Sequence, residues 1–259
     1  MQTNYKGTVF FDLDGTLLNN QSQVDDSVAS AVRQLKKNNY LPVICTGRAP
    51  IEIEAATSAT GIDTYVTLNG ALVESQSKTV YSNDIKPDVI KKIMDMAHKN
   101  GDSLFMHAHT RNSLSAQTPY IKEFFHALKL EIPEIDPNFY KKDAIPMFVI
   151  ITDDDGKKYQ EKFPELQIYN TGYHSLDTVA KGVSKMSGIK HLLEDLNMKD
   201  KPVYAFGDGA NDLPMIKFAD YGIAMANGID EVKDVATYIT TENVNGGIVK
   251  GLKHFDLID

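Results

Sequence analysis

The stretch Val9-Phe10-Phe11-Asp12-Leu13-Asp14-Gly15-Thr16-Leu17 decides how the rest of the chain is interpreted. The apolar run from Thr8 to Phe11 is typical of a buried strand in a parallel sheet, and it ends at two carboxylates one residue apart. Two like charges about 4 Å apart repel by roughly 4 kcal/mol even at an effective dielectric of 20, so a positive partner is expected there. A divalent cation with oxygen ligands fits best, because open α/β sheets bind their ligands at such strand ends. The alternative is an ordinary turn, since Asp and Gly are common turn residues.

The composition limits the classes of protein to consider. A chain of 259 residues suits one large domain or, closer to usual domain sizes, two. Apolar residues make up 42% and charged residues 24%, which is typical of a water-soluble globular protein with an ample core. The net charge of −8 argues against a nucleic-acid partner. It also means that a phosphate site would need local cations or a metal.

The single cysteine and the apolar runs indicate the compartment. With only Cys45 available, an internal disulfide is excluded and a reducing cytosol is compatible. Because Cys45 ends the apolar run that starts at Leu41, we expect a buried, inert thiol. The segment from Met1 to Gly7 has no apolar signal-peptide core, and no apolar run has the length of a membrane span. We therefore expect a cytoplasmic protein without a membrane partner.

Strands and helices alternate in the first and last thirds of the chain, which predicts right-handed crossovers and a doubly wound, mostly parallel, Rossmann-like α/β sheet. In these thirds the apolar periodicity predicts strands at 8–11, 41–45, 65–68, 203–206 and 221–224, and helices at 24–38, 51–60, 183–196, 213–218 and 231–236. In the middle it predicts a hairpin at 72–81, helices at 87–99 and 120–130, and strands at 103–106, 145–151, 166–169 and 173–179. We therefore expect one discontinuous core domain, residues 1–82 and 181–259, with an α+β domain inserted at 83–180.

Polar residues follow four of the predicted strands of the core domain. The four sets are Asp12 with Asp14, Thr46-Gly47-Arg48, Asn69-Gly70, and Asp208 with Asn211 and Asp212. The carboxyl ends of parallel strands meet at one edge of a sheet, so these side chains should lie close together. Oxygen ligands favour Mg²⁺, and the sequence offers no His/Cys cluster for zinc.

Simpler explanations exist for two of these sets. Thr46-Gly47-Arg48 could be a generic turn with a solvated arginine, and Asn69-Gly70 is a common signal for a type I′ turn. In the middle domain, each single residue among His107, His109, Arg111, His126 and His174 fits a surface or core position better than a substrate contact. The segment from Asp208 to Asp212 is harder to explain without a ligand, because three polar groups follow a buried strand directly.

The motifs taken together resemble a known family. Asp12-x-Asp14-Gly15-Thr16, Thr46 at a strand end, a downstream lysine and Gly207-Asp208-Gly209-x-Asn211-Asp212 are similar to the four motifs of the haloacid dehalogenase (HAD) superfamily, in order and over the whole chain. The insertion between the second and third motifs, and the turn Leu68-Asn69-Gly70-Ala71, resemble the Cof-like sugar-phosphatase branch, which has a large α/β cap. The segment 83–180 would then be the cap domain, which closes over the strand ends and selects the substrate.

The resemblance implies a role for each acidic residue. Asp12 would be the nucleophile that forms an aspartyl-phosphate, and Asp14 would be the general acid and base. Mg²⁺ would be held by the carboxylates of Asp12 and Asp208 and by the backbone carbonyl of Asp14. Asp212 would not bind the metal itself but would orient the lysine or a metal-bound water.

The resemblance also implies a phosphate-binding set. Thr46, the neighbouring Gly47 and Arg48, Asn69 and Asn211 would contact the phosphate, and a lysine would supply positive charge. Both Lys181 and Lys185 are candidates for that lysine. In the resembling family this lysine opens a helix, in a Val-x-Lys-Gly-like context that precedes the Gly-Asp-Gly motif. We favour Lys185, because Val183-Ser184-Lys185 fits that context, although Met186 stands where the family usually has glycine.

The sequence therefore predicts a Mg²⁺-dependent phosphatase whose partner is a small phosphorylated metabolite, such as a sugar phosphate or a related compound. One alternative is a phosphotransferase such as a phosphohexomutase, which would pass the same aspartyl-phosphate to a second substrate. Another is a phospho-accepting signalling module of the receiver type, which is about half this length and has no inserted domain. No motif indicates the particular metabolite or the oligomeric state.

Overall fold

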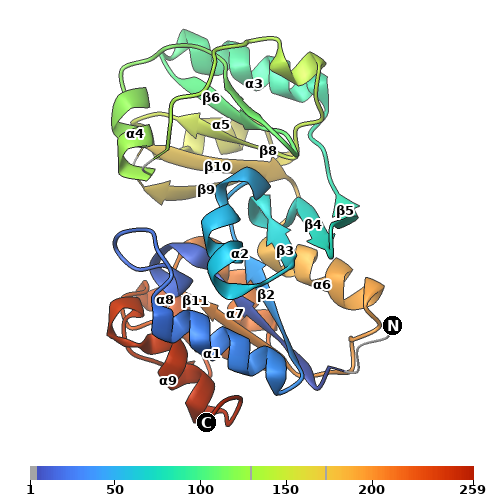
Figure 1. The fold of residues 1–259 in the computed structure, drawn as a ribbon. Coiled ribbons are helices and arrows are strands. Elements are labelled where there is room, and N and C mark those ends of the chain that lie inside the picture. Colours follow the sequence, from blue (N-terminus) through green and yellow to red (C-terminus); the bar gives the residue numbers. More distant parts are fainter. Residues whose placement is uncertain (1–4, 129, 173) are drawn as a thin grey trace. The chain divides into compact units, whose positions relative to one another are not determined.

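The computed structural model describes residues 5–128, 130–172 and 174–259, which form two compact units (Figure 1). The first unit comprises Met1–Arg48, Glu52–Tyr81 and Ser184–Asp259, and the second comprises Ala49–Ile51 and Ser82–Val183. Residues 1–4, 129 and 173, which fall within predicted segments, lie outside the described residues. The first unit is therefore built from segments far apart in the sequence.

The first unit contains an eight-stranded sheet in the order β13-β12-β11-β1-β2-β3-β4-β5. The strands are β1 (Gly7–Phe11), β2 (Tyr40–Cys45), β3 (Thr64–Thr67), β4 (Leu72–Ser75), β5 (Lys78–Ser82), β11 (Val203–Gly207), β12 (Tyr221–Ala224) and β13 (Tyr238–Ile239). The pairs from β13 to β3 are parallel, and β4 runs antiparallel to β3. The predicted doubly wound, mostly parallel fold class is confirmed.

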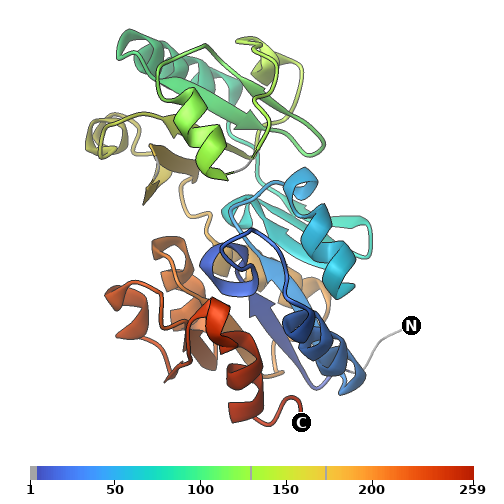
Figure 2. The ribbon, with the colours of Figure 1, turned by 60° about the vertical axis from the view of Figure 1, so that its left-hand side comes forward.

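Helices cover both faces of this sheet, which explains why its central strands are apolar throughout. They are α1 (Asp26–Lys37), α2 (Glu54–Thr60), α6 (Lys185–Asp195), α7 (Leu213–Phe218), α8 (Asp230–Lys233) and α9 (Gly247–His254). Along β1, Val9 and Phe11 pack in the cluster that contains α1 and α9, whereas Phe10 packs in the cluster that contains α6 and α7. Figure 2 shows α1 (blue) and α9 (red) on the same side of the sheet.

The sequence did not predict β13 and α9 of the first unit, nor the short strand Asn112–Leu114 and the short helix Lys157–Lys162 of the second unit. It also predicted two helices, at 51–60 and 231–236, that are longer than the observed ones. The segment 51–60 contains a 3₁₀ turn, Pro50–Glu52, before α2, and the predicted helix at 231–236 is the shorter α8. In α9 the glycines reduced the expected helicity. Gly251 nevertheless suits this helix, because a Cβ there would lie 2.4 Å from the Phe206 ring on β11. Close packing on the sheet thus outweighs local propensity.

The second unit has a five-stranded antiparallel sheet in the order β7-β6-β8-β10-β9. Its elements are α3 (Pro87–Lys99), β6 (Ser103–His107), β7 (Asn112–Leu114), α4 (Ile121–Leu128), β8 (Met147–Ile151), α5 (Lys157–Lys162), β9 (Leu166–Gly172) and β10 (Ser175–Ala180). Helices α3 and α5 pack on one face of the sheet. On the other face, Phe105 of β6 contacts Phe124 and Phe125 of α4.

The order of the first sheet places the strand ends that matter next to one another. Strand β1 lies in the middle, with β2 on one side and β11 on the other, so the direction of winding changes there. The carboxyl ends of β1, β2, β3 and β11 lead directly into the four polar sets. None of the helices in the described part of the chain combines the length and apolar character needed to span a bilayer.

Candidate active site

Asp12 follows β1 and is 94% buried, at the start of the tight turn Leu13–Leu17. Within that turn Gly15 has φ +76°, in the left-handed region that favours glycine. A Cβ at Gly15 would also lie 2.3 Å from Oδ2 of Asp208. The glycine therefore allows the turn after β1 to approach the carboxylate that follows β11.

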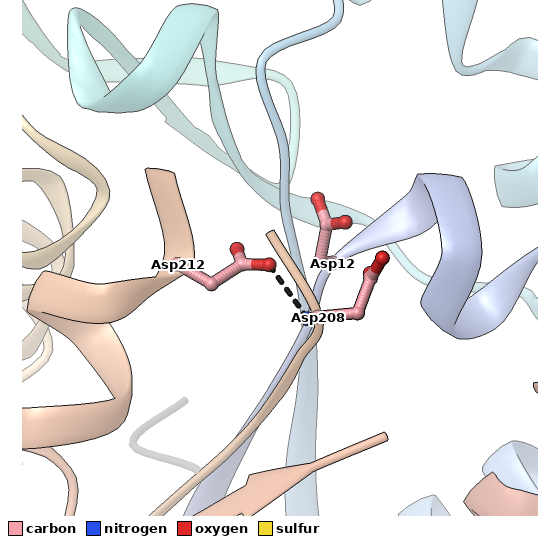
Figure 3. A group of neighbouring side chains, drawn as sticks. All are labelled: Asp12, Asp208 and Asp212. Carbon is pink, nitrogen blue, oxygen red and sulfur yellow. Dashed lines mark hydrogen bonds between the residues drawn. The ribbon is translucent and has the colours of Figure 1, made fainter. Parts of the chain in front are cut away.

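The loop after β11 is organised by the buried carboxylate of Asp212. Its Oδ2 accepts a hydrogen bond from the backbone N–H of Asp208 at 2.9 Å (Figure 3). The same oxygen accepts a second one from the backbone N–H of Gly209, also at 2.9 Å. The loop is also joined to the turn after β1, because the Thr16 hydroxyl donates to Oδ1 of Asp208 at 2.7 Å. These bonds fix both the backbone and the side chain of Asp208.

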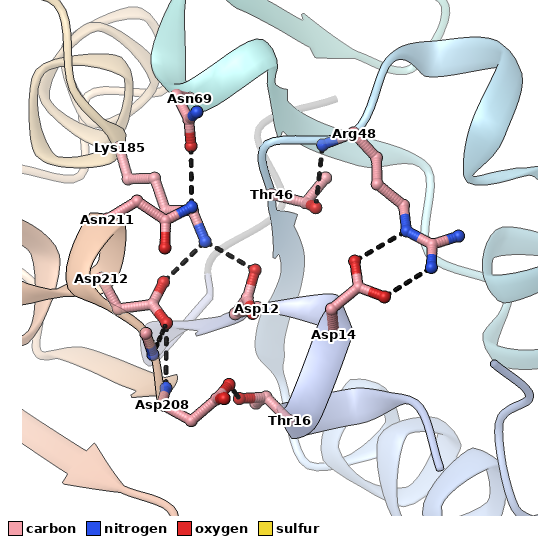
Figure 4. Close-up of polar contacts among 11 residues, drawn as sticks. Asp12, Asp14, Thr16, Thr46, Arg48, Asn69, Lys185, Asp208, Asn211 and Asp212 are labelled. Atoms are coloured by element: carbon pink, nitrogen blue, oxygen red, sulfur yellow. Dashed lines mark hydrogen bonds and ion pairs between the residues drawn. The ribbon is translucent and has the colours of Figure 1, made fainter. Parts of the chain in front are cut away.

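Lys185 lies at the first position of α6, where Ser184 and Ser187 form a capping box. Its ammonium is fully buried and donates to Oδ1 of Asp12 at 2.5 Å and to Oδ1 of Asp212 at 2.6 Å (Figure 4). Gly70 allows the start of α6 to come this close, because a Cβ there would lie 2.0 Å from the Ser184 carbonyl oxygen. The other candidate, Lys181, is exposed in the second unit. Lys185 is thus the lysine that reaches the aspartates.

The ionisable groups of this cluster strongly affect one another. Burial raises the pKa of Asp12 well above its ordinary value, and the negative charge of Asp212 adds to this. Burial and the same neighbour raise the pKa of Asp208 to about 7. Burial works against the charged form of Lys185, but Asp12 and Asp212 outweigh it and raise its pKa. Nearby, burial raises the pKa of the Cys45 thiol, in keeping with the expected inert cysteine.

A divalent cation fits this donor set. Asp12, Asp208 and Asp212 each offer a carboxylate oxygen, and the three oxygens lie within 4.8 Å of one another. The structure thus brings Asp12 and Asp208 together, as the sequence predicted. When all groups are ionised, three carboxylates and the ammonium of Lys185 leave two negative charges, which one divalent cation would balance. Both oxygens of Asp212 already accept hydrogen bonds, which leaves Asp12 and Asp208 as the better ligands.

The residues after β2 hold the neighbouring strand ends together. Thr46 is buried, its hydroxyl accepts a hydrogen bond from the Arg48 N–H at 3.1 Å, and its carbonyl accepts one from the Asn69 N–H at 3.1 Å. Gly47 lies between Thr46 and Arg48 in this turn. The Arg48 guanidinium donates to both oxygens of Asp14, through Nε at 2.8 Å and Nη2 at 2.5 Å. Burial opposes the charge of Arg48, but Asp14 outweighs it and raises the pKa of the arginine. The structure therefore contradicts the alternative of a simply solvated Arg48.

Asn69 serves both as a turn residue and as a contact of the site. With φ 52° and ψ 32° at Asn69, φ 93° at Gly70 and a hydrogen bond from Ala71 N–H to the Leu68 carbonyl, the segment is a type I′ turn. The buried Asn69 side chain also accepts a hydrogen bond from Nδ2 of Asn211 at 2.9 Å. The turn explanation is thus correct, and the residue joins the ends of β3 and β11 as well.

Three polar residues around the site had no predicted role: Thr16, Asn227 and Asn243. Thr16 was visible in the first motif, but its bond to Asp208 spans 192 positions of the sequence. Asn227 lies three residues after β12, so an extension of the strand-end argument to that strand could have found it. Nothing in the sequence pattern singled out Asn243.

Comparisons with known proteins agree with this geometry. Residues 9–252 match the family described as haloacid dehalogenase-like hydrolase. "Putative phosphatase YkrA" of Bacillus subtilis is 30% identical over 251 residues, which cover 96% of this chain and 98% of YkrA. "5-amino-6-(5-phospho-D-ribitylamino)uracil phosphatase YcsE" of the same organism is 28% identical over 96% of this chain and 95% of its own. The solved structure of the HAD subclass IIB sugar phosphatase BT4131 superimposes with a TM-score of 0.89 at 26% identity, over 97% of this chain and all of BT4131.

Proposed function

The chain belongs to the haloacid dehalogenase-like hydrolase family and is a phosphatase, and we propose that it hydrolyses small phosphorylated metabolites with Mg²⁺ through an aspartyl-phosphate on Asp12. The observation that carries this proposal is the meeting of Asp12 and Asp208, at adjacent strand ends, with Lys185 at the start of α6. A carboxylate nucleophile, a second carboxylate for a metal and a buried cation are the groups that phosphoryl transfer requires.

The proposed reaction has two steps, which use the same pair of carboxylates. An oxygen of Asp12 attacks phosphorus, the bond from phosphorus to the ester oxygen breaks, and Asp14 gives that oxygen a proton, which yields an alcohol and an aspartyl-phosphate. Water then attacks the aspartyl-phosphate while Asp14 takes up a proton, which releases phosphate and restores Asp12. Burial raises the pKa of Asp12, and Lys185, which donates to its carboxylate, acts in the opposite direction and favours the ionised nucleophile.

The pair formed by Arg48 and Asp14 adds a step before the chemistry. An ionised Asp14 that accepts two bonds from a guanidinium has no proton to give. We infer that a dianionic phosphate competes for Arg48, since arginine binds phosphate and carboxylate in the same two-pronged manner. The arrival of substrate would then free the Asp14 carboxylate to take up a proton from solvent, which it afterwards gives to the leaving oxygen.

The metal site is assigned to three groups of the first unit. The carboxylates of Asp12 and Asp208, with the backbone carbonyl of Asp14, would hold Mg²⁺, and Asp212 would keep the loop and Lys185 in place. When bound, Mg²⁺ would neutralise the negative charges of the nucleophile and the phosphate. Thr46 and Asn211 would donate hydrogen bonds to the phosphate oxygens.

The substrate class follows from what the relatives' names have in common. BT4131 is named a sugar phosphatase, and YcsE is named for a 5-phospho-D-ribityl compound. Both names describe a phosphate ester on a chain of hydroxylated carbons. We propose the same class for this chain, with selection among such esters assigned to residues 83–180, in the second unit.

A phosphate-release screen over sugar phosphates, polyol phosphates and phosphorylated cofactors tests this proposal. We expect release with Mg²⁺, loss of release in EDTA, and none from the Asp12→Asn variant. Release without any added acceptor distinguishes hydrolysis from transfer to a second substrate. If no compound releases phosphate in the presence of Mg²⁺ but phosphate moves between two sugars, the protein is a phosphotransferase and the proposal is wrong.

A further inference from the structure

The segment that follows β12 contacts both of the loops that carry the site carboxylates. Its backbone binds the loop after β11, because the N–H groups of Met225 and Ile229 donate to the carbonyls of Gly207 and Asp208, both at 3.0 Å. Its Asn227 side chain binds the turn after β1, because Nδ2 donates to the Gly15 carbonyl at 2.8 Å. The segment thus joins two loops whose carboxylates must face the same cation.

Asn243 holds the Asn227 side chain in this position. The Asn243 backbone N–H donates to Oδ1 of Asn227 at 3.0 Å, so the Asn227 amide is bound at both ends. The buried Asn243 side chain donates from Nδ2 to the Leu18 carbonyl at 2.8 Å, at the other end of the same turn. The two asparagines therefore fix the turn after β1 at both Gly15 and Leu18.

The position of this turn is linked directly to the metal ligands. Gly15 has no room for a side chain beside Asp208, and the next residue, Thr16, donates its hydroxyl to the Asp208 carboxylate. The Asp14 carbonyl, the third proposed ligand, belongs to the peptide group that precedes Gly15. A shift of the turn would therefore move two of the three ligand groups at once, the Asp14 carbonyl and the Asp208 carboxylate. A misplacement of about 1 Å can cost 10²-fold in activity.

We propose that Asn227 and Asn243 are positioning residues for the divalent cation: through the Gly15 and Leu18 carbonyls they hold the turn after β1 against the loop after β11. This inference rests on the proposed function, because it concerns the same metal site. Both side-chain amides donate to backbone carbonyls of the turn, so both would act through its backbone.

The chain offers a closely matched control in Asn38. Its Nδ2 donates to the Leu257 carbonyl at 2.8 Å, between segments of the first unit that are 219 positions apart, and it lies at the end of α1 opposite to the strand ends. Asn243→Ala and Asn38→Ala each remove one long-range amide-to-carbonyl bond of the same length. A structural role alone predicts similar losses of stability and no change in metal binding for either variant.

The test measures Mg²⁺ binding to the substrate-free protein by titration calorimetry, together with thermal unfolding in EDTA. We expect Asn227→Ala and Asn243→Ala to weaken Mg²⁺ binding by about 10-fold, in the range found for residues that orient metal ligands. Asn38→Ala should bind Mg²⁺ as the wild type does, although its unfolding temperature falls. Since Asn227 is exposed, its variant should fold even if Asn243→Ala does not.

The outcomes separate this inference from the proposed function. If the wild type binds Mg²⁺ and Asn227→Ala binds it equally well, the positioning role is wrong and the phosphatase proposal stands. Weaker binding in all three variants, Asn38→Ala included, would also overturn the positioning role, because the effect would then follow stability. If the wild type itself binds no Mg²⁺, the proposed metal dependence fails and the inference fails with it.

Discussion

Each unit of this protein buries a polar cluster that contains a carboxylate, and the two clusters differ in how their charges are balanced. In the second unit Asp102 is the one buried carboxylate of its cluster: it accepts a hydrogen bond from the Tyr159 hydroxyl at 2.5 Å, and the Lys158 ammonium lies 3.7 Å away. Asn100 completes the cluster by donating to the Tyr159 hydroxyl. The Lys158 ammonium also lies 3.2 Å from the Asp154 carboxylate, but Lys158 and Asp154 are partly exposed to solvent. Asp102 is thus the single buried charge of this set, it has a positive charge beside it, and every polar group of the set has a partner.

The cluster of the first unit has the same kinds of groups in a different ratio. Three carboxylates, those of Asp12, Asp208 and Asp212, share the single ammonium of Lys185. Burial first, and the charge of the neighbouring Asp212 second, raise the pKa values of Asp12 and Asp208. Buried charges normally persist only when they are paired. A balanced cluster needs nothing further to be stable, whereas an unbalanced one implies a ligand of opposite charge.

The largest expected effect is that of Asp12→Asn on turnover. The amide removes the nucleophile, and we expect phosphate release to fall by at least ~10³-fold. Because burial already disfavours the charged form of Asp12, the variant should unfold at the same or a higher temperature than the wild type in EDTA. The matched change in the balanced cluster, Asp102→Asn, should lower stability and leave kcat nearly unchanged. Turnover near the wild-type value in Asp12→Asn would exclude Asp12 as the nucleophile.

The next effect concerns the metal. Asp208→Ala removes a proposed ligand, and we expect the Mg²⁺ concentration for half-maximal activity to rise about 100-fold. Activity measured against Mg²⁺ concentration checks this. Asp220→Ala is a suitable control, because Asp220 bonds the Val203 N–H at the opposite end of β11. An unchanged metal requirement in Asp208→Ala would show that another group holds the cation.

A smaller effect is expected when the pair beside the nucleophile is broken. Arg48→Ala should raise KM about 10-fold, because a phosphate contact is lost. The control is Arg33→Ala. Arg33 lies in α1 of the same unit and donates to the Ala59 carbonyl of α2. Steady-state kinetics of both variants measure the change. If Arg48→Ala lowers kcat alone and KM stays constant, Arg48 only holds Asp14 and the phosphate contact is excluded.

These expectations also mark how far the sequence leads. The meeting of Asp12 and Asp208 was predictable, because the carboxyl ends of adjacent parallel strands must lie at one edge of a sheet. Lys185 was predictable over Lys181 from the resemblance, because Val183-Ser184-Lys185 fits the helix start at which the family has its lysine. The pairing of Arg48 with Asp14 was not, since it depends on side-chain torsions that no spacing rule describes. Asn243 bonds Leu18 across 225 positions without a motif, so only the folded chain reveals the contact.

The raised pKa of Asp208, caused by burial and by the charge of Asp212, also predicts how the stability of the metal-free protein depends on pH. The pKa of Asp208 is about 7 in the folded chain, against an ordinary value of 3.8, so the folded state keeps a proton that the unfolded state releases. This contribution is fully present below pH ~4 and is lost as the pH rises through ~7. Thermal unfolding in EDTA should therefore occur at lower temperature at pH 8 than at pH 5, and Mg²⁺ should recover part of the loss at pH 8. An Asp208→Asn variant with the same pH profile as the wild type would contradict this explanation.

The sharpest comparison of the two clusters removes one hydroxyl from each. Thr16→Val deletes the donor to Asp208, and Tyr159→Phe deletes the donor to Asp102. In the balanced cluster the loss leaves a buried carboxylate short of one bond, which should cost about 1–3 kcal/mol of stability and leave the Mg²⁺ requirement unchanged. In the unbalanced cluster the same loss frees the Asp208 carboxylate to rotate, so Mg²⁺ activation should weaken by about 3–10-fold. Both variants are measured by thermal unfolding and by Mg²⁺ titration of activity. Tyr159→Phe should change mainly the unfolding temperature, and Thr16→Val mainly the Mg²⁺ concentration needed for activity. If both variants lose only stability, Asp208 is held for structural reasons like Asp102, and the difference in charge balance has no bearing on metal binding.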